Sequence, residues 1–138
     1  MNTQSTTTQT KIDQSLRLAY LAAQAAIDKK AENVCILDLQ DQSSFTDYFL
    51  ICSAYSDRQV NAICDAIKSR VIGEGFEVLS TEGYTEGRWV IMDLGDIVVH
   101  VFMDAIREYY NIESLWSRAV QVPIPPELYT DSHSSSLN

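Results

Sequence analysis

The chain has 138 residues, of which 46% are hydrophobic, and its 19 acidic and 10 basic side chains give a formal net charge of −9. This length and apolar content suit a single domain with one core, and no uninterrupted apolar stretch approaches the length of a membrane span. The negative charge argues against direct nucleic-acid specificity, because phosphates are repelled on average. It suits a basic protein partner instead.

The cysteines indicate a reducing environment. Cys35, Cys52 and Cys64 each lie in an apolar run, without the close pairing that a zinc site needs. We therefore expect buried free thiols, which persist in reducing compartments. Residues 1–10 are rich in Thr, Gln and Ser and lack the apolar run of a signal peptide. These features favour a cytoplasmic protein that does not associate with a membrane.

The first part of the chain predicts a helix followed by two strands. Apolar residues recur at helical spacing over residues 15–30, which predicts an amphipathic helix. Residues 34–37 form a short apolar run typical of a strand covered on both faces. Residues 48–52 are rich in aromatic and branched side chains and predict a second strand that pairs with the first.

A second helix and a weaker strand follow. Ser56 and Gln59 have the spacing of a capping box, in which the two side chains satisfy free backbone N–H groups at a helix start. This helix should end at Gly73 or Gly75, since glycine readily takes the left-handed conformation. Residues 76–80 predict a strand at or near an edge of the sheet.

A tight hairpin is the clearest local prediction. Residues 88–94 and 97–102 both have the composition of strands, and the link Gly95-Asp96 between them is typical of a short turn. Beyond the hairpin, residues 104–110 and 112–117 predict short helical segments. Three of their side chains should lie back on the sheet, namely Tyr109, Leu115 and Trp116.

The predicted domain spans residues 13–120. Residues 1–12 are expected to form a disordered N-terminal tail. Residues 121–138, which are rich in Pro and Ser, are expected to form a disordered C-terminal tail, because they cannot bury enough apolar surface to offset the entropy of ordering.

Two candidate catalytic groups can be weighed from the sequence. Clustered carboxylates from Asp47, Asp93 and Asp96 would suit magnesium in a nucleotidyl or phosphoryl transferase. Asp93 and Asp96 flank a turn, however, where aspartate is favoured whatever the function, and no glycine-rich phosphate loop accompanies them. His100 lies inside an apolar strand, where it could act as a base, a metal ligand, a partner contact or a histidine paired by one neighbour. A metal site with His133 would need an ordered tail.

The hairpin also presents a candidate binding surface. By the alternation of a strand, two rows of side chains should share one face: Trp89, Ile91 and Asp93, and beside them Val98, His100 and Phe102. If helices cover only the other face, this aromatic and apolar strip beside acids would suit docking of a partner. Alternatively, Trp89 is simply part of the core.

The chain resembles the Iojap, or ribosomal silencing factor, family over about residues 16–116. The resemblance rests on the order and spacing of several phrases: SFTDYF at 44–49, SDRQV at 56–60, EG at 82–83, GRWV at 87–90, DLGDIVVHVF at 93–102 and LW at 115–116. It implies an α/β (α+β) domain with a mixed sheet packed by helices, similar to a nucleotidyltransferase without its catalytic machinery. With the strands predicted above, the sheet should have five strands.

The resemblance also implies a function. A member of this family would bind the large ribosomal subunit through its universal protein L-fourteen and sterically block joining of the small subunit, which represses translation under nutrient limitation. Such a protein is not an enzyme and needs no catalytic residue, cofactor or metal.

Carried over by position, the resemblance places partner contacts on Trp89, Leu94, Asp96, His100, Phe102 and Tyr110, and Asp93 is expected to join them. Trp89 is the expected anchor, Asp93 and Asp96 are the expected acidic rim, and Leu94 is the expected apolar contact at the turn. Two alternatives stay open: the metal-dependent transferase, and a domain that pairs with a second copy of itself through the hairpin face.

Overall fold

The computed structural model describes residues 3–129, with side chains from residue 14 onward. The strands are β1 (Glu32–Asp38), β2 (Tyr48–Ala54), β3 (Ser80–Glu82), β4 (Trp89–Asp93), β5 (Ile97–Met103) and β6 (Val120–Val122). They form one six-stranded sheet in the order β3-β4-β5-β2-β1-β6. Only the central pair, β2 and β5, runs parallel, and all other neighbours are antiparallel. The predicted mixed α/β domain is therefore confirmed.

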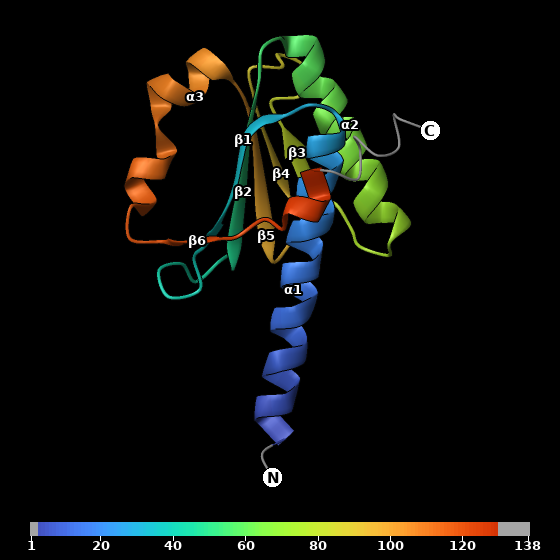
Figure 1. The fold of residues 1–138 in the computed structure, drawn as a ribbon, viewed down its shortest axis with the longest axis vertical. Coiled ribbons are helices and arrows are strands. Elements are labelled where there is room, and N and C mark those ends of the chain that lie inside the picture. Colours follow the sequence, from blue (N-terminus) through green and yellow to red (C-terminus); the bar gives the residue numbers. More distant parts are fainter. Residues whose placement is uncertain (1–2, 130–138) are drawn as a thin grey trace.

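Helices lie on both faces of this sheet. The long helices α1 (Thr3–Asp28) and α2 (Asp57–Gly73) pack side by side on one face, and α3 (Asp104–Tyr110) with the 3-10 helix η1 (Ile112–Trp116) lies on the other, as Figure 1 shows. Among the described residues, no helix is both long and apolar enough to cross a membrane. One face of the sheet is therefore covered by α1 and α2, and the other is partly covered by α3 and η1.

The main core lies between the sheet and the pair α1–α2. Side chains of β4 and β5 alternate between the two faces, so Val90, Met92, Val99 and Val101 join this core. All seven residues of β2 are buried because both of its faces are covered. A second, smaller core lies under α3 and η1 and contains Leu37, Leu39, Phe49, Ile51, Phe102 and Ile112.

Helix α2 begins and ends nearly as its sequence predicts. Ser56 is the N-cap, and its hydroxyl accepts a hydrogen bond from the backbone N–H of Gln59 at 3.1 Å. The side-chain oxygen Oε1 of Gln59 accepts a hydrogen bond from the N–H of Tyr55 at 2.9 Å, one residue before the cap, so the capping box is displaced by one position. Gly75, with φ of +92°, takes the left-handed conformation just beyond the helix end.

Several predicted boundaries are corrected by the structure. Helix α1 begins at Thr3, so the expected tail of residues 1–12 is helical from there on. The edge strand β3 occupies Ser80–Glu82 instead of residues 76–80, because it pairs with β4 in the register that joins Ser80 to Asp93. The sheet has six strands instead of five, because β6 adds to the free edge of β1.

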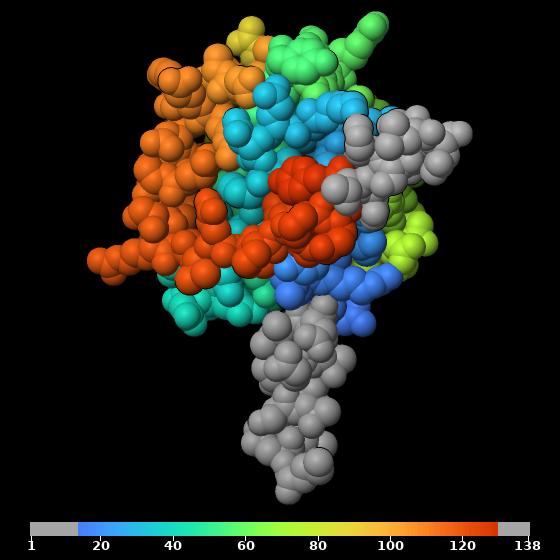
Figure 2. Space-filling model, in the orientation of Figure 1, coloured from blue at the N-terminus to red at the C-terminus, as the bar shows by residue number. Residues whose placement is uncertain are grey.

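The C-terminal segment up to Tyr129 packs on the domain instead of forming a tail. After β6, the Tyr20 hydroxyl of α1 donates to the carbonyl of Pro123 at 3.0 Å, and Ile124 packs against the main core. Figure 2 shows this red segment crossing over the blue surface of α1. Apolar burial and backbone pairing with β1 offset the entropy of ordering here. The serine-rich residues 130–138, including His133, lie outside the described residues.

A candidate docking face on the sheet

The loop before β4 fixes where Trp89 begins its strand. Gly83 has φ of +83°, and a Cβ built there would lie 2.2 Å from the Trp89 carbonyl oxygen, so only glycine fits. The N–H of Met103 donates to the Arg88 carbonyl at 2.8 Å, which ties the start of β4 to the end of β5. The indole therefore enters the sheet face from a constrained backbone.

Six ring-bearing residues gather on the face that α3 and η1 partly cover. We call this group the aromatic face: Phe49, Trp89, His100, Phe102, Tyr110 and Trp116. The Trp89 ring stacks on Phe102 with centroids 4.9 Å apart and lies 5.1 Å from the ring of Tyr110. The backbone register pairs Trp89 directly with Phe102, so strand pairing sets the first of these contacts.

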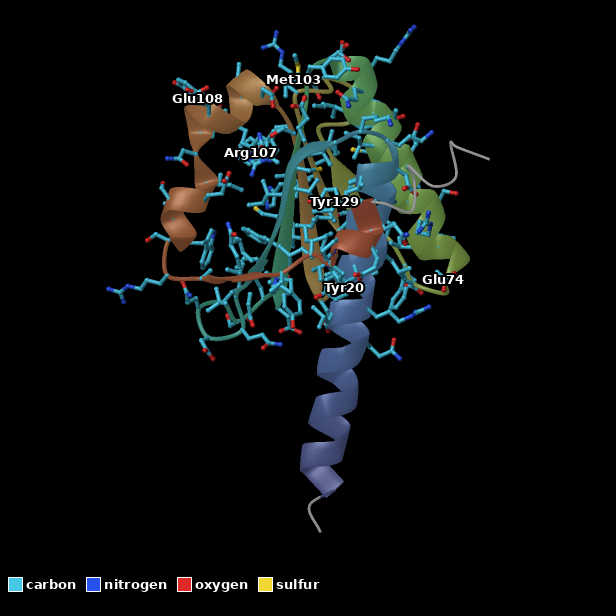
Figure 3. All side chains as sticks on the ribbon, in the orientation of Figure 1. Tyr20, Glu74, Met103, Arg107, Glu108 and Tyr129 are labelled. Atoms are coloured by element: carbon cyan, nitrogen blue, oxygen red, sulfur yellow. The ribbon has the colours of Figure 1, made fainter. Side chains whose placement is uncertain are left out.

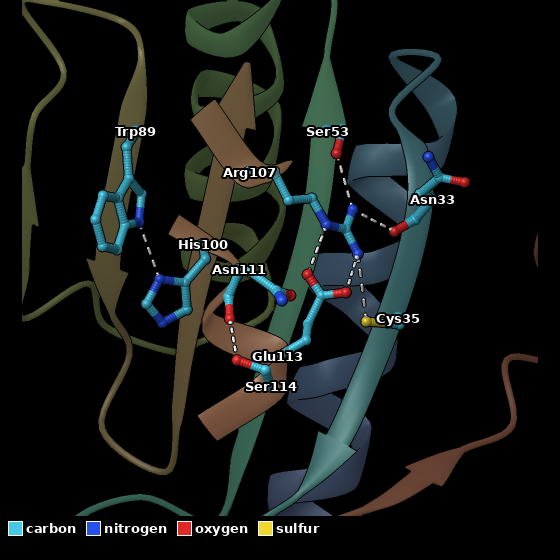
Figure 4. Close-up of polar contacts among 9 residues, drawn as sticks. All are labelled: Asn33, Cys35, Ser53, Trp89, His100, Arg107, Asn111, Glu113 and Ser114. Atoms are coloured by element: carbon cyan, nitrogen blue, oxygen red, sulfur yellow. Dashed lines mark hydrogen bonds and ion pairs between the residues drawn. The ribbon is translucent and has the colours of Figure 1, made fainter. Parts of the chain in front are cut away.

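His100 is buried and holds the Trp89 indole in place. It is only 6% exposed, and its Nδ1 accepts a hydrogen bond from the Trp89 indole N–H at 3.1 Å (Figure 4). Burial lowers the pKa of His100 to about 4, so the imidazole is neutral near pH 7. Because Nδ1 accepts, the proton of the neutral ring sits on Nε2. Nε2 is buried and has no hydrogen-bond partner within the described part of the chain.

Only part of the aromatic face is accessible to another molecule. Trp89 is half-buried, whereas Tyr110 is 54% exposed and Tyr109, packed edge-on against it, is 80% exposed. The half-buried Asp93 lies on the same strand as Trp89, and the exposed Asp104 and Glu108 lie on the same helix as Tyr110. The two elements that carry the accessible rings therefore also carry acidic side chains.

Three of the residues expected to contact a partner are buried or lie away from Trp89 and Tyr110. Phe102 is completely buried, so it supports Trp89 from below, as His100 does. Leu94 belongs to the main core on the side of α1 and α2, because continued alternation after Val90 and Met92 places it on the face opposite Trp89. Asp96 lies at the end of the sheet, where it accepts a hydrogen bond from Ser15 of α1 at 3.0 Å.

One of the three side chains of α3 and η1 that were predicted to lie back on the sheet does so. Trp116 does lie back on the sheet, edge-on to Phe49 with centroids 5.7 Å apart. Tyr109 and Leu115 do not, since they are 80% and 76% exposed. Phe49 also supports this face, a role that no pattern in the sequence indicates because it depends on the parallel pairing of β2 with β5.

The three candidate carboxylates are not assembled into one group. Ser15 brings two of them together, with its hydroxyl 3.0 Å from Asp96 Oδ2 and 3.4 Å from Asp47 Oδ2. Asp93 instead accepts the N–H of Gly95 at 2.8 Å, a turn contact. Within residues 14–129, no group of three His, Cys, Asp or Glu side chains is placed to hold a metal ion. No observation of this geometry favours the transferase alternative.

The cysteines are free thiols, as expected. Cys52 and Cys64 are buried, and burial raises the pKa of both thiols, that of Cys64 to about 12. Cys35 is half-buried, and desolvation raises its pKa as well, in spite of the nearby Arg107 guanidinium. None of the three is poised as a nucleophile, because the thiolate is the reactive form.

Comparison with known proteins shows the family of the chain. A profile of the family described as "ribosomal silencing factor during starvation" matches residues 12–137. The chain belongs to the ribosomal silencing factor family. The family profile reaches past the expected end of the domain at residue 120, in keeping with the packed C-terminal segment.

Named relatives in bacteria and plants support this membership. The ribosomal silencing factor of Bacillus subtilis is 50% identical over 99 residues, which cover 72% of this chain and 84% of the relative. That of Halalkalibacterium halodurans is 46% identical over 78% of this chain and 92% of its own length. The chloroplastic protein Iojap of Zea mays is 32% identical over 80% of this chain and 48% of its own length.

Solved structures share the fold. A crystal structure of a Chromobacterium violaceum protein, 33% identical, superposes with a TM-score of 0.73 over 74% of this chain and 85% of its own. A crystal structure of a Bacillus halodurans protein, 44% identical, gives a TM-score of 0.70 over 78% of this chain and 98% of its own.

Proposed function

We propose that this member of the silencing family docks on the large ribosomal subunit through its universal protein L-fourteen and sterically blocks joining of the small subunit. Translation is then repressed when nutrients are limiting. The single observation that carries the proposal is the accessible pair Trp89 and Tyr110, held in contact on a sheet face that α3 and η1 only partly cover.

The chemistry of this face suits a protein partner with a basic surface. Binding energy in protein interfaces concentrates in a few aromatic or arginine side chains near the centre, with polar groups at the rim. Trp89 and Tyr110 would form such a centre, and Asp93, Asp104 and Glu108 would form the rim. A net charge of −9 would speed encounter with a basic ribosomal protein and disfavour contact with RNA alone.

Steric occlusion needs no chemical step. A folded domain bound where the two subunits meet would prevent their contact by its volume alone, so the proposal requires no catalytic residue or cofactor. Because its target is the ribosome, we place the action of the chain in the cytoplasm.

The proposal is tested by co-sedimentation of the purified chain with separated ribosomal subunits at modest salt. We expect wild type to pellet with large subunits and not with small subunits. Replacement of the anchors, Trp89→Ala and Tyr110→Ala, should each weaken binding about tenfold or more, as truncation of a central aromatic residue commonly does. Addition of small subunits afterwards should yield fewer joined particles when wild type is present.

A matched control comes from the opposite side of the molecule. Ile72 is an exposed apolar residue near the end of α2, on the covered side of the sheet, so Ile72→Ala should bind as wild type does. Circular dichroism checks that each variant is folded. Failure of wild type to bind large subunits, or equal binding by a folded Trp89→Ala, would overturn the proposal.

Pairing with a second copy of the chain through the same face would compete with docking. Sedimentation equilibrium over a range of concentrations tests this alternative. If the chain forms a dimer, and both Trp89→Ala and added large subunits dissociate it, then the copies pair through the docking face. A chain that stays monomeric at all concentrations would exclude it.

A further inference from the structure

Helix α3 has few stabilising interactions within itself. It is seven residues long, it buries none of its residues, and its N-cap Met103 makes no side-chain cap bond. Helices shorter than about 12 residues are not stable alone, so contacts with the sheet must fix it. Ile106 and Ile112 pack on the second core, but apolar contacts are non-directional and leave the rotation of α3 poorly defined.

Arg107 supplies the directional contacts. Its Nη1 donates to the carbonyl of Asn33 at 2.7 Å and to the hydroxyl of Ser53 at 2.8 Å. Its Nε and Nη2 donate to the two carboxylate oxygens of Glu113 at 2.9 and 3.2 Å. Nη2 also lies 3.8 Å from the Cys35 sulfur. The guanidinium therefore contacts β1, β2 and η1 at once, as Figure 4 shows.

The burial and geometry of this network make it more than a surface ion pair. The Arg107 side chain is only 12% exposed, and Ser53 is buried. A planar guanidinium with a two-point carboxylate contact fixes orientation as well as distance. Figure 3 shows Arg107 directed from α3 toward the sheet while the next residue, Glu108, points outward.

The orientation of Arg107 determines that of Tyr110. Residues three apart on a helix lie on neighbouring parts of its surface. With Arg107 directed to β1 and β2, Tyr110 is brought over β4, where its ring lies 5.1 Å from that of Trp89. A rotation of α3 that released Arg107 would carry Tyr110 away from Trp89.

We propose that Arg107 is a positioning residue of the docking face: it does not touch the partner, and it sets α3 so that Tyr110 stands against Trp89. This inference rests on the docking function proposed above. It predicts that removal of the guanidinium weakens docking only through the loss of the correct position of Tyr110.

A double-mutant cycle on binding to purified large subunits tests this coupling. Arg107→Met should weaken binding about fivefold or more in the wild-type background, but less than about twofold when Tyr110→Ala is already present. Arg107→Lys keeps the positive charge and the aliphatic part of the side chain but loses the planar guanidinium, so it should weaken binding to an intermediate degree. This variant also serves as the test if Arg107→Met folds poorly.

Arg70 offers a matched control on the opposite layer. Its guanidinium donates to Gln24 at 3.0 Å and pairs with Asp28 at 3.1 Å between α1 and α2. Arg70→Met should therefore leave binding within about twofold of wild type, because the control removes a comparable arginine network far from Tyr110. The inference would be overturned if Arg107→Met weakened binding equally with and without Tyr110. It would also be overturned if folded Arg107→Met and Arg107→Lys both bound as wild type does.

A spectroscopic measurement separates this inference from the docking proposal. The chain has two tryptophans, so its indole ¹⁵N–¹H spectrum should contain two signals, which Trp116→Phe assigns. Arg107→Met should shift the Trp89 signal through the altered Tyr110 ring, and Arg70→Met should not. If wild type fails to bind large subunits, the docking function falls, and this spectrum alone decides whether Arg107 positions Tyr110. An unchanged Trp89 signal in Arg107→Met would reject that role.

Discussion

The indole N–H of Trp89 donates to Nδ1 of His100 across the β4–β5 pair, at 3.1 Å. This bond joins a half-buried anchor to a buried histidine, and it fixes both the orientation of the indole and the tautomer of the imidazole. The position of Trp89 on the aromatic face therefore depends on a buried side chain.

Replacement of His100 should disturb Trp89 without unfolding the chain. His100→Leu removes the acceptor, whereas His100→Gln keeps a side-chain carbonyl as acceptor. A hydrogen bond of this kind contributes about 1 kcal/mol, so His100→Leu should weaken large-subunit binding roughly fivefold, and His100→Gln less. The indole signal of Trp89 should move upfield in His100→Leu. An unchanged signal and unchanged binding would show that the bond does not position the ring.

The stability of the chain should fall in mild acid because of His100. Burial lowers its pKa from 6.5 to about 4, so above pH 6.5 the residue is neutral in both the folded and the unfolded chain. Below that pH the unfolded chain takes up a proton that the folded chain does not, and the free energy of unfolding falls. At about 1.4 kcal/mol per pKa unit, the loss from this residue should be roughly 2 kcal/mol at pH 5.

Urea unfolding near pH 7 and near pH 5 measures this effect. His100→Gln has no imidazole at this position and should lose less stability between the two pH values than wild type does. The carboxylates are common to both proteins, so the difference between them isolates His100. Equal losses in wild type and His100→Gln would contradict the lowered pKa.

The turn before Trp89 should tolerate no side chain larger than that of glycine. Gly83→Ala places a methyl group against the Trp89 carbonyl at a φ of +83°, so it should lower the free energy of unfolding by about 2 kcal/mol or more. Gly73→Ala is the matched control, because Gly73 ends α2 with open space around it. It should be neutral or stabilising by up to about 1 kcal/mol. Thermal unfolding of both variants tests the contrast; equal effects would refute it.

The thiols should be nearly inert in the folded chain. Burial raises the pKa of Cys52 and holds that of Cys64 at about 12, so little thiolate is present near pH 8. An aromatic disulfide reagent should label all three cysteines rapidly in urea and slowly in native buffer. Cys35→Ser shows how much of the native rate belongs to the half-buried thiol. Rapid native labelling of Cys52 or Cys64 would contradict their burial.

Local patterns in the sequence determined much of the fold. The β4–β5 hairpin, the β1–β2 pair, the helix boundaries of α2 and the whole of α3 follow from alternation, helical spacing and turn residues, which act between near neighbours in the chain. The family resemblance rests on the same local phrases. The same resemblance indicates Trp89 and Tyr110, and the structure places their rings 5.1 Å apart.

Tertiary structure alone decided which of these residues a partner can reach. His100 shares a strand face with Trp89, yet it is buried, because Phe49 of the distant strand β2 packs against it. Arg107 links Asn33 and Ser53, which are 74 and 54 residues away in sequence. Strand β6 likewise exists only because β1 offers it a free edge. Such contacts join distant segments, and no local spacing encodes them, so burial and position emerge only when the sheet and its two helical layers are assembled.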